Sequence, residues 1–208
     1  KNPIGSEQSD YTVKYSGTAA VDYTYYFYGT GARASLATIN AAMKLSQVQR
    51  TVTAPTSAGA LTSDTKSVTY YTNGAGYEQS DYTVKYAGTT AVDYTRYFYD
   101  TGVMAGSATV NKKMYASQTD TGAAVTALGA ASTTKSITYY ANEVGDEQSS
   151  YTVKYSGGST VDWTYYFYGD SVSSGRAGTA TVNKAMYISQ VQKTSVAPVT
   201  AGAATPFT

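Results

Sequence analysis

Glu7–Thr30 reads EQSDYTVKYSGTAAVDYTYYFYGT, and this pattern returns as EQSDYTVKYAGTTAVDYTRYFYDT from Glu78 and as EQSSYTVKYSGGSTVDWTYYFYGD from Glu147. The three starts lie 71 and 69 residues apart. This period exceeds the roughly 20 to 50 residues of common solenoid repeats and is long enough for a small β domain. The chain is therefore a tandem array. We place its units at residues 1–65, 66–134 and 135–208.

Alternating apolar and polar residues in each copy predict two successive β-strands. In the first strand Tyr11, Val13 and Tyr15 alternate with polar residues, and Gly17 ends the run, which is the period of a half-buried strand before a turn. The second stretch, 21–28, is aromatic on both faces. One of these faces is expected to be core, and the other forms a tyrosine surface.

Two further segments of the repeat are predicted to be strands. Ala37–Gln47 recurs in all three copies; a helix is the alternative there, because Ile39 and Met43 are four residues apart. Lys66–Thr72 (KSVTYYT) and Lys135–Ala141 (KSITYYA) indicate another strand, followed by the turn-forming sequences NGAG and NEVG.

The fold class predicted from these patterns is all-β, with three tandem small β-sandwich or barrel-like (Ig-like) units of about 70 residues each. Thr51–Ser63 and Thr119–Ser132 have the composition of linkers. They favour beads on a string over a single domain with threefold pseudosymmetry. The architecture resembles bacterial immunoglobulin-like surface repeats in general terms only, and no motif indicates a particular family.

The KS[VI]TYY segment occurs twice, whereas the rest of the unit occurs three times. One terminal unit is therefore expected to lack a strand. Such a unit exposes unpaired backbone groups that readily pair with a strand from another chain. Our hypothesis is that a terminal segment of one molecule completes the deficient unit of the next, and a contact that does not close would build a filament. An irregular end cap is the alternative.

Composition excludes several classes of function. The net charge is +1 and only 14% of residues are charged, which argues against a protein that tracks nucleic-acid phosphates. The chain has no His and no Cys, so disulfides, thiolate metal sites and histidine acid–base chemistry are excluded. We expect no enzymatic activity, no cofactor and no membrane span.

The acidic residues that recur in every copy were weighed as a catalytic carboxylate pair, as calcium ligands and as structural groups. We favour the structural interpretation, with the glutamates in inter-strand turns and the aspartates paired across the sheet with a basic residue such as Lys14. These residues are Glu7, Glu78, Glu147, Asp22, Asp93 and Asp162.

The outward-facing tyrosines are the predicted interaction surface. Cross-strand aromatic ladders would use such residues to stiffen a sheet, and sugar rings would stack on them. Trp163 replaces Tyr23 at an inward position and is expected in the core. The predicted surface comprises Tyr26, Tyr28, Tyr97, Tyr99, Tyr166 and Tyr168.

These observations favour a non-enzymatic structural protein that forms part of a fibre, filament or surface assembly, with copies of itself as partners. The alternative is a multivalent carbohydrate-binding adhesin whose tyrosine platforms bind surface glycans. An extracellular, cell-surface or virion-surface location is expected in either case. The chain starts at Lys1 rather than Met, which fits a processed secreted protein or a piece of a longer one.

Overall fold

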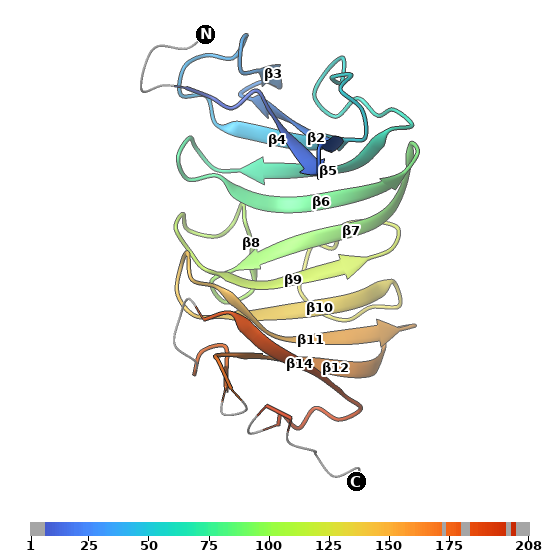
Figure 1. Cartoon of the computed structure of the whole chain (residues 1–208), viewed down its shortest axis with the longest axis vertical. Coiled ribbons are helices and arrows are strands. Elements are labelled where there is room, and N and C mark those ends of the chain that lie inside the picture. The colour runs from blue at the N-terminus through green and yellow to red at the C-terminus, as the bar shows by residue number, and fades with distance from the viewer. Residues whose placement is uncertain (1–6, 172–173, 180–183, 199–200, 203–208) are drawn as a thin grey trace. The chain divides into compact units, whose positions relative to one another are not determined.

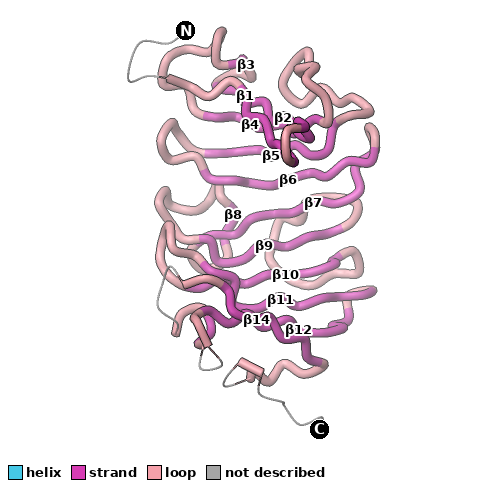
Figure 2. The backbone as a smooth tube through the Cα atoms, in the orientation of Figure 1, coloured by secondary structure: helices cyan, strands magenta, loops and turns pink. Residues whose placement is uncertain are grey.

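The computed structural model describes residues 7–171, 174–179, 184–198 and 201–202. These residues form fourteen β-strands, and no helix occurs among them (Figure 2). The all-β prediction is confirmed. Two compact units are distinguished, Lys1–Thr95 and Arg96–Thr208, and their boundary falls within β7 (Thr90–Tyr99). The three-unit boundaries proposed from the sequence stay a prediction.

Unit 1 contains an antiparallel meander in which strands that follow one another in the sequence lie side by side (Figure 1). The order across the sheet is β1-β2-β4-β5-β6, and the short β3 pairs with β2. The predicted strands are confirmed here. Their bounds are β1 Tyr11–Ser16, β2 Ala19–Tyr28, β3 Ala32–Arg33, β4 Met43–Gln49, β5 Thr65–Thr72 and β6 Gln79–Ala87.

Unit 2 repeats this arrangement with the order β9-β10-β11-β12. Strand β12 also pairs with β13 and β14, and β8 pairs with the end of β7. The bounds are β8 Val103–Met104, β9 Met114–Asp120, β10 Thr134–Ala141, β11 Gln148–Ser156, β12 Ser159–Tyr168, β13 Gly175–Arg176 and β14 Met186–Gln192.

The segment Ala37–Gln47 is a strand only from Met43 onward, where β4 begins. The preceding residues form turns, and Asn40 has a φ of 60° that a regular strand or helix does not accommodate. The helical alternative is therefore wrong in the first copy. In the third copy, residues 180–183 of the corresponding segment lie outside the described part of the chain.

The register of the strand pairs decides which side chains of unit 1 share a face. Tyr25 of β2 faces Gln47 of β4, which in turn faces Val68 of β5. The next residue of β2, Tyr26, faces Ser46 and so lies on the opposite side of the sheet. The predicted inner and outer faces are confirmed for Tyr25 and Tyr26, whereas Tyr28, predicted on the outer face, is buried beyond a register shift between Phe27 and Tyr28.

Three clusters of buried side chains form the core, one from each sequence copy. Trp163 packs against the third, which confirms its predicted core position. A phenylalanine is fully buried in each cluster, and burial of one such side chain contributes about 1.5–3 kcal/mol. The clusters are Tyr25, Phe27, Leu45 and Val68; Phe98, Ala116 and Ile137; and Tyr165, Phe167 and Ala201.

The segments predicted as linkers instead cover the core. Ala58, from the loop after β4, packs against the first cluster. Val125 and Leu128, from the loop after β9, pack against the second. Loops rather than a second sheet thus supply these core contacts, and an Ig-like sandwich is not confirmed.

A buried glutamine holds each of these two loops on the sheet. Gln47 Nε2 donates a hydrogen bond to the backbone oxygen of Ala60 (2.8 Å). Gln118 binds both backbone groups of Gly129: its Nε2 donates to the carbonyl (2.7 Å) and its Oε1 accepts from the N–H (2.9 Å). Both glutamine side chains are fully buried, so these bonds give the buried side-chain amides polar partners and tie each loop to the sheet.

Replacing Gln118 with Leu should lower the free energy of unfolding by about 1–3 kcal/mol, because the loop loses both hydrogen bonds between Gln118 and Gly129 and each such bond contributes about 0.5–1.5 kcal/mol. Urea denaturation followed by circular dichroism measures this change. Thr121→Val, which removes an exposed hydroxyl from the same loop, should change stability by no more than about 0.5 kcal/mol. Equal effects of the two substitutions would contradict the anchoring role.

Candidate functional site

Half of the predicted tyrosine surface is buried. Tyr28, Tyr99 and Tyr168 are less than a tenth exposed. The hydroxyl of Tyr28 donates to the backbone oxygen of Ser9 (2.8 Å), and that of Tyr168 donates in the same way to Ser149 (2.9 Å). Tyr28 thus fastens the segment before β1 to β2, and Tyr168 fastens the start of β11 to β12.

Tyr26, Tyr97 and Tyr166 are partly exposed. The Tyr26 hydroxyl lies 3.2 Å from Thr12 Oγ1, and the Tyr166 hydroxyl lies 3.0 Å from Thr152 Oγ1. These contacts favour the cross-strand ladder over a free sugar platform, because the polar edge of each ring already has a partner. These three tyrosines are the members of the predicted interaction surface that reach solvent.

Further hydroxyl pairs continue the ladder on this face. Each joins two neighbouring strands through side chains of the face opposite the core. Such pairs each contribute roughly 0.2–1 kcal/mol to a sheet. They are Thr69–Thr83 (2.8 Å), Thr138–Thr152 (2.8 Å), Ser46–Tyr71 (3.2 Å) and Ser117–Tyr140 (3.2 Å).

Strands β5 and β10, which carry the KS[VI]TYY sequence, are paired on both edges. Tyr70 of β5 stacks on Tyr82 of β6 with ring centroids 4.5 Å apart. Tyr139 of β10 stacks likewise on Tyr151 of β11 at 4.7 Å. Offset stacking of this kind adds about 0.5–1.5 kcal/mol to simple burial.

An ion pair ties β5 to β2, although β4 lies between them. Asp22 faces Lys14 in the register of β1 and β2, as expected. Its carboxylate, however, accepts two hydrogen bonds from Lys66 Nζ, at 2.8 Å to Oδ1 and 3.0 Å to Oδ2. The expected partner Lys14 is thus corrected to the lysine of the KS[VI]TYY strand. That lysine recurs as Lys135 in the second KS[VI]TYY segment, and this recurrence is the sequence signal that indicates it as a partner of the recurrent aspartate.

Glu78 and Glu147 lie in inter-strand turns, as predicted, and bind backbone N–H groups there, whereas Glu7 lies before β1. Glu78 Oε1 accepts from Met43 N (3.0 Å) and its Oε2 accepts from Gly76 N (2.8 Å). Glu147 repeats the first contact with Met114 N (3.1 Å). Each of these two glutamates therefore joins the turn after a KS[VI]TYY strand to the start of the strand before it.

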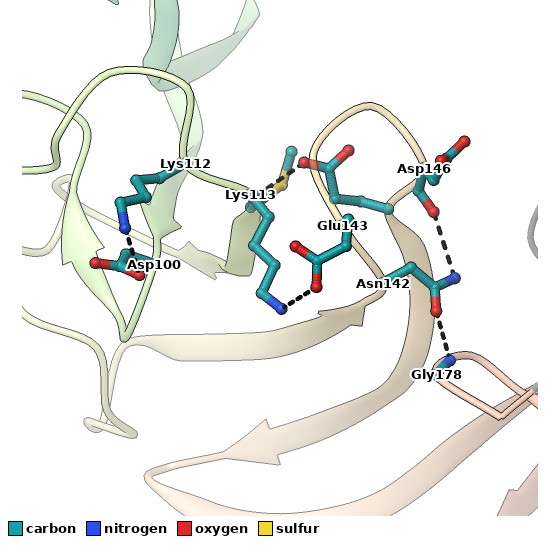
Figure 3. Close-up of polar contacts among 9 residues, drawn as sticks. Asp100, Lys112, Lys113, Asn142, Glu143, Asp146 and Gly178 are labelled. Atoms are coloured by element: carbon teal, nitrogen blue, oxygen red, sulfur yellow. Dashed lines mark hydrogen bonds and ion pairs between the residues drawn. The ribbon is translucent and has the colours of Figure 1, made fainter.

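Figure 3 shows how the turn after β10 is fixed. The side chain of Asn142 lies between Asp146 and Gly178: Nδ2 donates to the Asp146 carbonyl (3.3 Å), and Oδ1 accepts from Gly178 N (2.8 Å). Lys113 reaches Glu143 at 3.5 Å. Because that carboxylate is largely exposed, the ion pair contributes little, and the amide contacts hold the turn.

The outer edges of β1 and β14 carry no partner strand among the described residues. On β1, Tyr11 and Tyr15 are 51% and 61% exposed. On β14, Ile188 is 38% exposed, whereas Leu45 at the equivalent position of β4 is 4% exposed. Strand β5 covers the corresponding edge of β4. These two edges are the candidate interaction site.

No three acidic side chains in the described part of the chain lie close enough together to hold a metal ion. Over the same residues, no helix has the length and apolar character needed to cross a membrane.

Burial, together with the smaller effect of neighbouring tyrosines, raises the pKa of Tyr86 and of Tyr139 to about 12. The folded state therefore holds these protons more tightly than the unfolded state, whose phenols titrate near pH 10. Their contribution to stability is complete below pH 10 and is lost as the pH rises towards 12. Unfolding by urea at pH 9, 10 and 11.5 should show a falling stability.

In the double variant Tyr86→Phe/Tyr139→Phe the loss of stability between pH 9 and pH 11.5 should be smaller. The phenolate absorbance at 295 nm should also lose the component that appears at the highest pH. Tyr15→Phe/Tyr77→Phe, which alters two exposed rings, is the matched control and should retain both. An unchanged pH dependence in the first double variant would refute the assignment.

No protein-family model matches the chain, and comparisons with curated proteins and with solved structures find no significant match.

Proposed function

We propose that the chain is a non-enzymatic structural protein, built from three small β units, that joins a larger assembly by adding a β-strand at an open sheet edge. The observation that carries the proposal is the edge of β14. Its apolar Ile188 is exposed at the position where the first repeat covers Leu45 with another strand. Uncovered edges of this kind accept a strand from a second chain.

The open edge of β1 supports the same function. Tyr11 of β1 occupies the position of Tyr82 and Tyr151 in the repeat, and each of those rings stacks on a tyrosine of a KS[VI]TYY strand. Without such a strand, Tyr11 is half exposed. The two edges thus lack the same kind of neighbour.

Strand direction restricts how such an assembly continues the repeat. Both β4 and β6 are antiparallel to β5, so they run parallel to each other. A junction with this geometry needs one strand between β14 of one molecule and β1 of the next molecule. The sequence suggested a terminal segment as the donor, and residues 1–6 and 203–208 at the two ends lie outside the described residues.

Composition supports a fibre, filament or surface layer outside the cytoplasm. The chain has few charges and no His or Cys, and its strands are rich in Thr and Tyr. Such a sequence offers little for acid–base catalysis and much for extended pairing. Copies of the same chain are the proposed partners. Glycan binding is the less supported alternative, because half of its tyrosine set is buried.

Sedimentation velocity and negative-stain electron microscopy over a range of concentrations test the proposal. The wild-type chain should form larger species as its concentration rises. Val191→Lys, which places a charge on the exposed edge strand β14, should raise the concentration needed for association at least about tenfold, because edge lysines oppose strand pairing.

Val196→Lys is the matched control, since Val196 is equally exposed but follows β14 rather than belonging to it. This variant should associate as the wild type does. Monomers at every concentration, or equal association of both variants, would rule out assembly through this edge.

A further inference from the structure

A buried glutamine beside the open edge lacks partners that its counterpart has. Gln192 occupies the register position on β14 that Gln49 occupies on β4. Gln49 Oε1 accepts hydrogen bonds from Thr62 Oγ1 (3.1 Å) and Thr65 Oγ1 (3.3 Å). Gln192 is 8% exposed, and its Oε1 has no hydrogen-bond partner in the described structure. The donors of Gln49 include the threonine that begins β5, and residues 203–208, which follow β14, lie outside the described part of this chain.

The second repeat uses the same threonine position. There Thr134, the first residue of β10, donates from Oγ1 to Asp120 Oδ1 at 2.7 Å. Nitrogen Nε2 is without a partner in both Gln49 and Gln192. The difference between these two glutamines is therefore confined to the acceptor oxygen, which is the atom a threonine hydroxyl would bind.

A buried carboxylate shows the same deficiency. Asp162 faces Lys154 in the register of β11 and β12, just as Asp22 faces Lys14. Asp22 receives two hydrogen bonds from Lys66 of β5, which lies beyond β4 in the sheet. Asp162 is 9% exposed, and its Oδ1 has no partner within the described residues. A buried carboxylate without its cation is strongly unfavourable, so this site favours an incoming lysine.

We propose that the β14 edge binds an extended Thr-Lys-Ser-Val/Ile-Thr-Tyr-Tyr segment of another polypeptide that carries this repeat. The threonine hydroxyl donates to Gln192 Oε1, and the lysine ammonium pairs with Asp162. By the register of the first repeat, the apolar fourth residue of the segment faces Gln190, and the tyrosine two residues later faces Ile188, as Val68 and Tyr70 face Gln47 and Leu45. This inference rests on the proposed function and specifies the chemistry of the strand that is added.

The two polar contacts fix the register of the incoming strand. Side chains alternate between the faces of a strand, so threonine and lysine, which are adjacent, meet groups on opposite faces of the sheet. A shift by one residue would move the lysine to the face opposite Asp162 and the threonine to the face opposite Gln192. Apolar strands without this Thr-Lys pair are therefore discriminated against.

The probe is a capped, fluorescently labelled peptide with the sequence TTKSITYYAN, which is that of residues 133–142. Fluorescence anisotropy measures its binding to the full chain and to Asp162→Asn. We expect this variant to bind about tenfold more weakly, because a charge-assisted hydrogen bond is lost. Asp170→Asn, which removes an exposed carboxylate from the same unit, is the matched control and should bind as the wild type does.

A peptide with methionine in place of the lysine completes a double-mutant cycle. The methionine peptide should bind the wild-type chain about tenfold more weakly than the parent peptide does. Its affinity for Asp162→Asn should be close to its affinity for the wild type, because the interaction that the substitution removes is already absent. Hydrogen exchange should slow at the amides of Met186–Gln192 when the parent peptide is added. Absence of binding, equal binding to wild type and Asp162→Asn, or protection confined to β1 would overturn the inference.

The outcomes separate this inference from the proposed function. If the chain stays monomeric at all concentrations but binds the peptide through Asp162, the strand-binding site is supported and the proposed self-assembly is refuted. A chain that assembles but neither binds the peptide nor responds to Asp162→Asn retains assembly and loses the assigned site.

Discussion

Pairing along both edges of β5 is the interaction on which the structure of unit 1 depends. This strand joins β4 to β6, supplies Val68 to the core, and brings Lys66 to a carboxylate two strands away. Its copy β10 joins β9 to β11 in the same manner. Because backbone pairing, apolar burial and charge neutralisation coincide in one segment, loss of that segment affects all three at once.

The strands of each copy could be read from period-two alternation, and the turns from Asn and Gly; Asn73 and Asn142 both adopt the positive φ that such turns require. The loops over the core could not be read this way. Their small residues resemble a linker, and only Gln47 and Gln118, which are polar residues at inward positions, distinguish them. Composition alone does not show which backbone group a buried amide will reach.

Contacts between residues far apart in the chain could not be predicted from the sequence either. The carboxylate of Asp22 was assigned to Lys14 because that residue lies directly across the strand pair, yet Lys66, which is 44 residues away, takes its place. Tyr28 was placed on the surface by its position in the alternation. Its burial depends on the segment before β1, whose Ser9 carbonyl accepts from the tyrosine hydroxyl. Neither contact leaves a periodic signal.

The glutamine-held loops have a consequence for how the chain acquires its structure. The bonds from Gln47 and Gln118 close over separations of 13 and 11 residues, and the strands pair with near neighbours in the sequence. Each core is thus completed by chain that immediately follows it. In arrays whose repeats contact mainly their neighbours, order propagates from one repeat to the next. A chain emerging from its N-terminus can therefore form each repeat in turn, without waiting for its distant end.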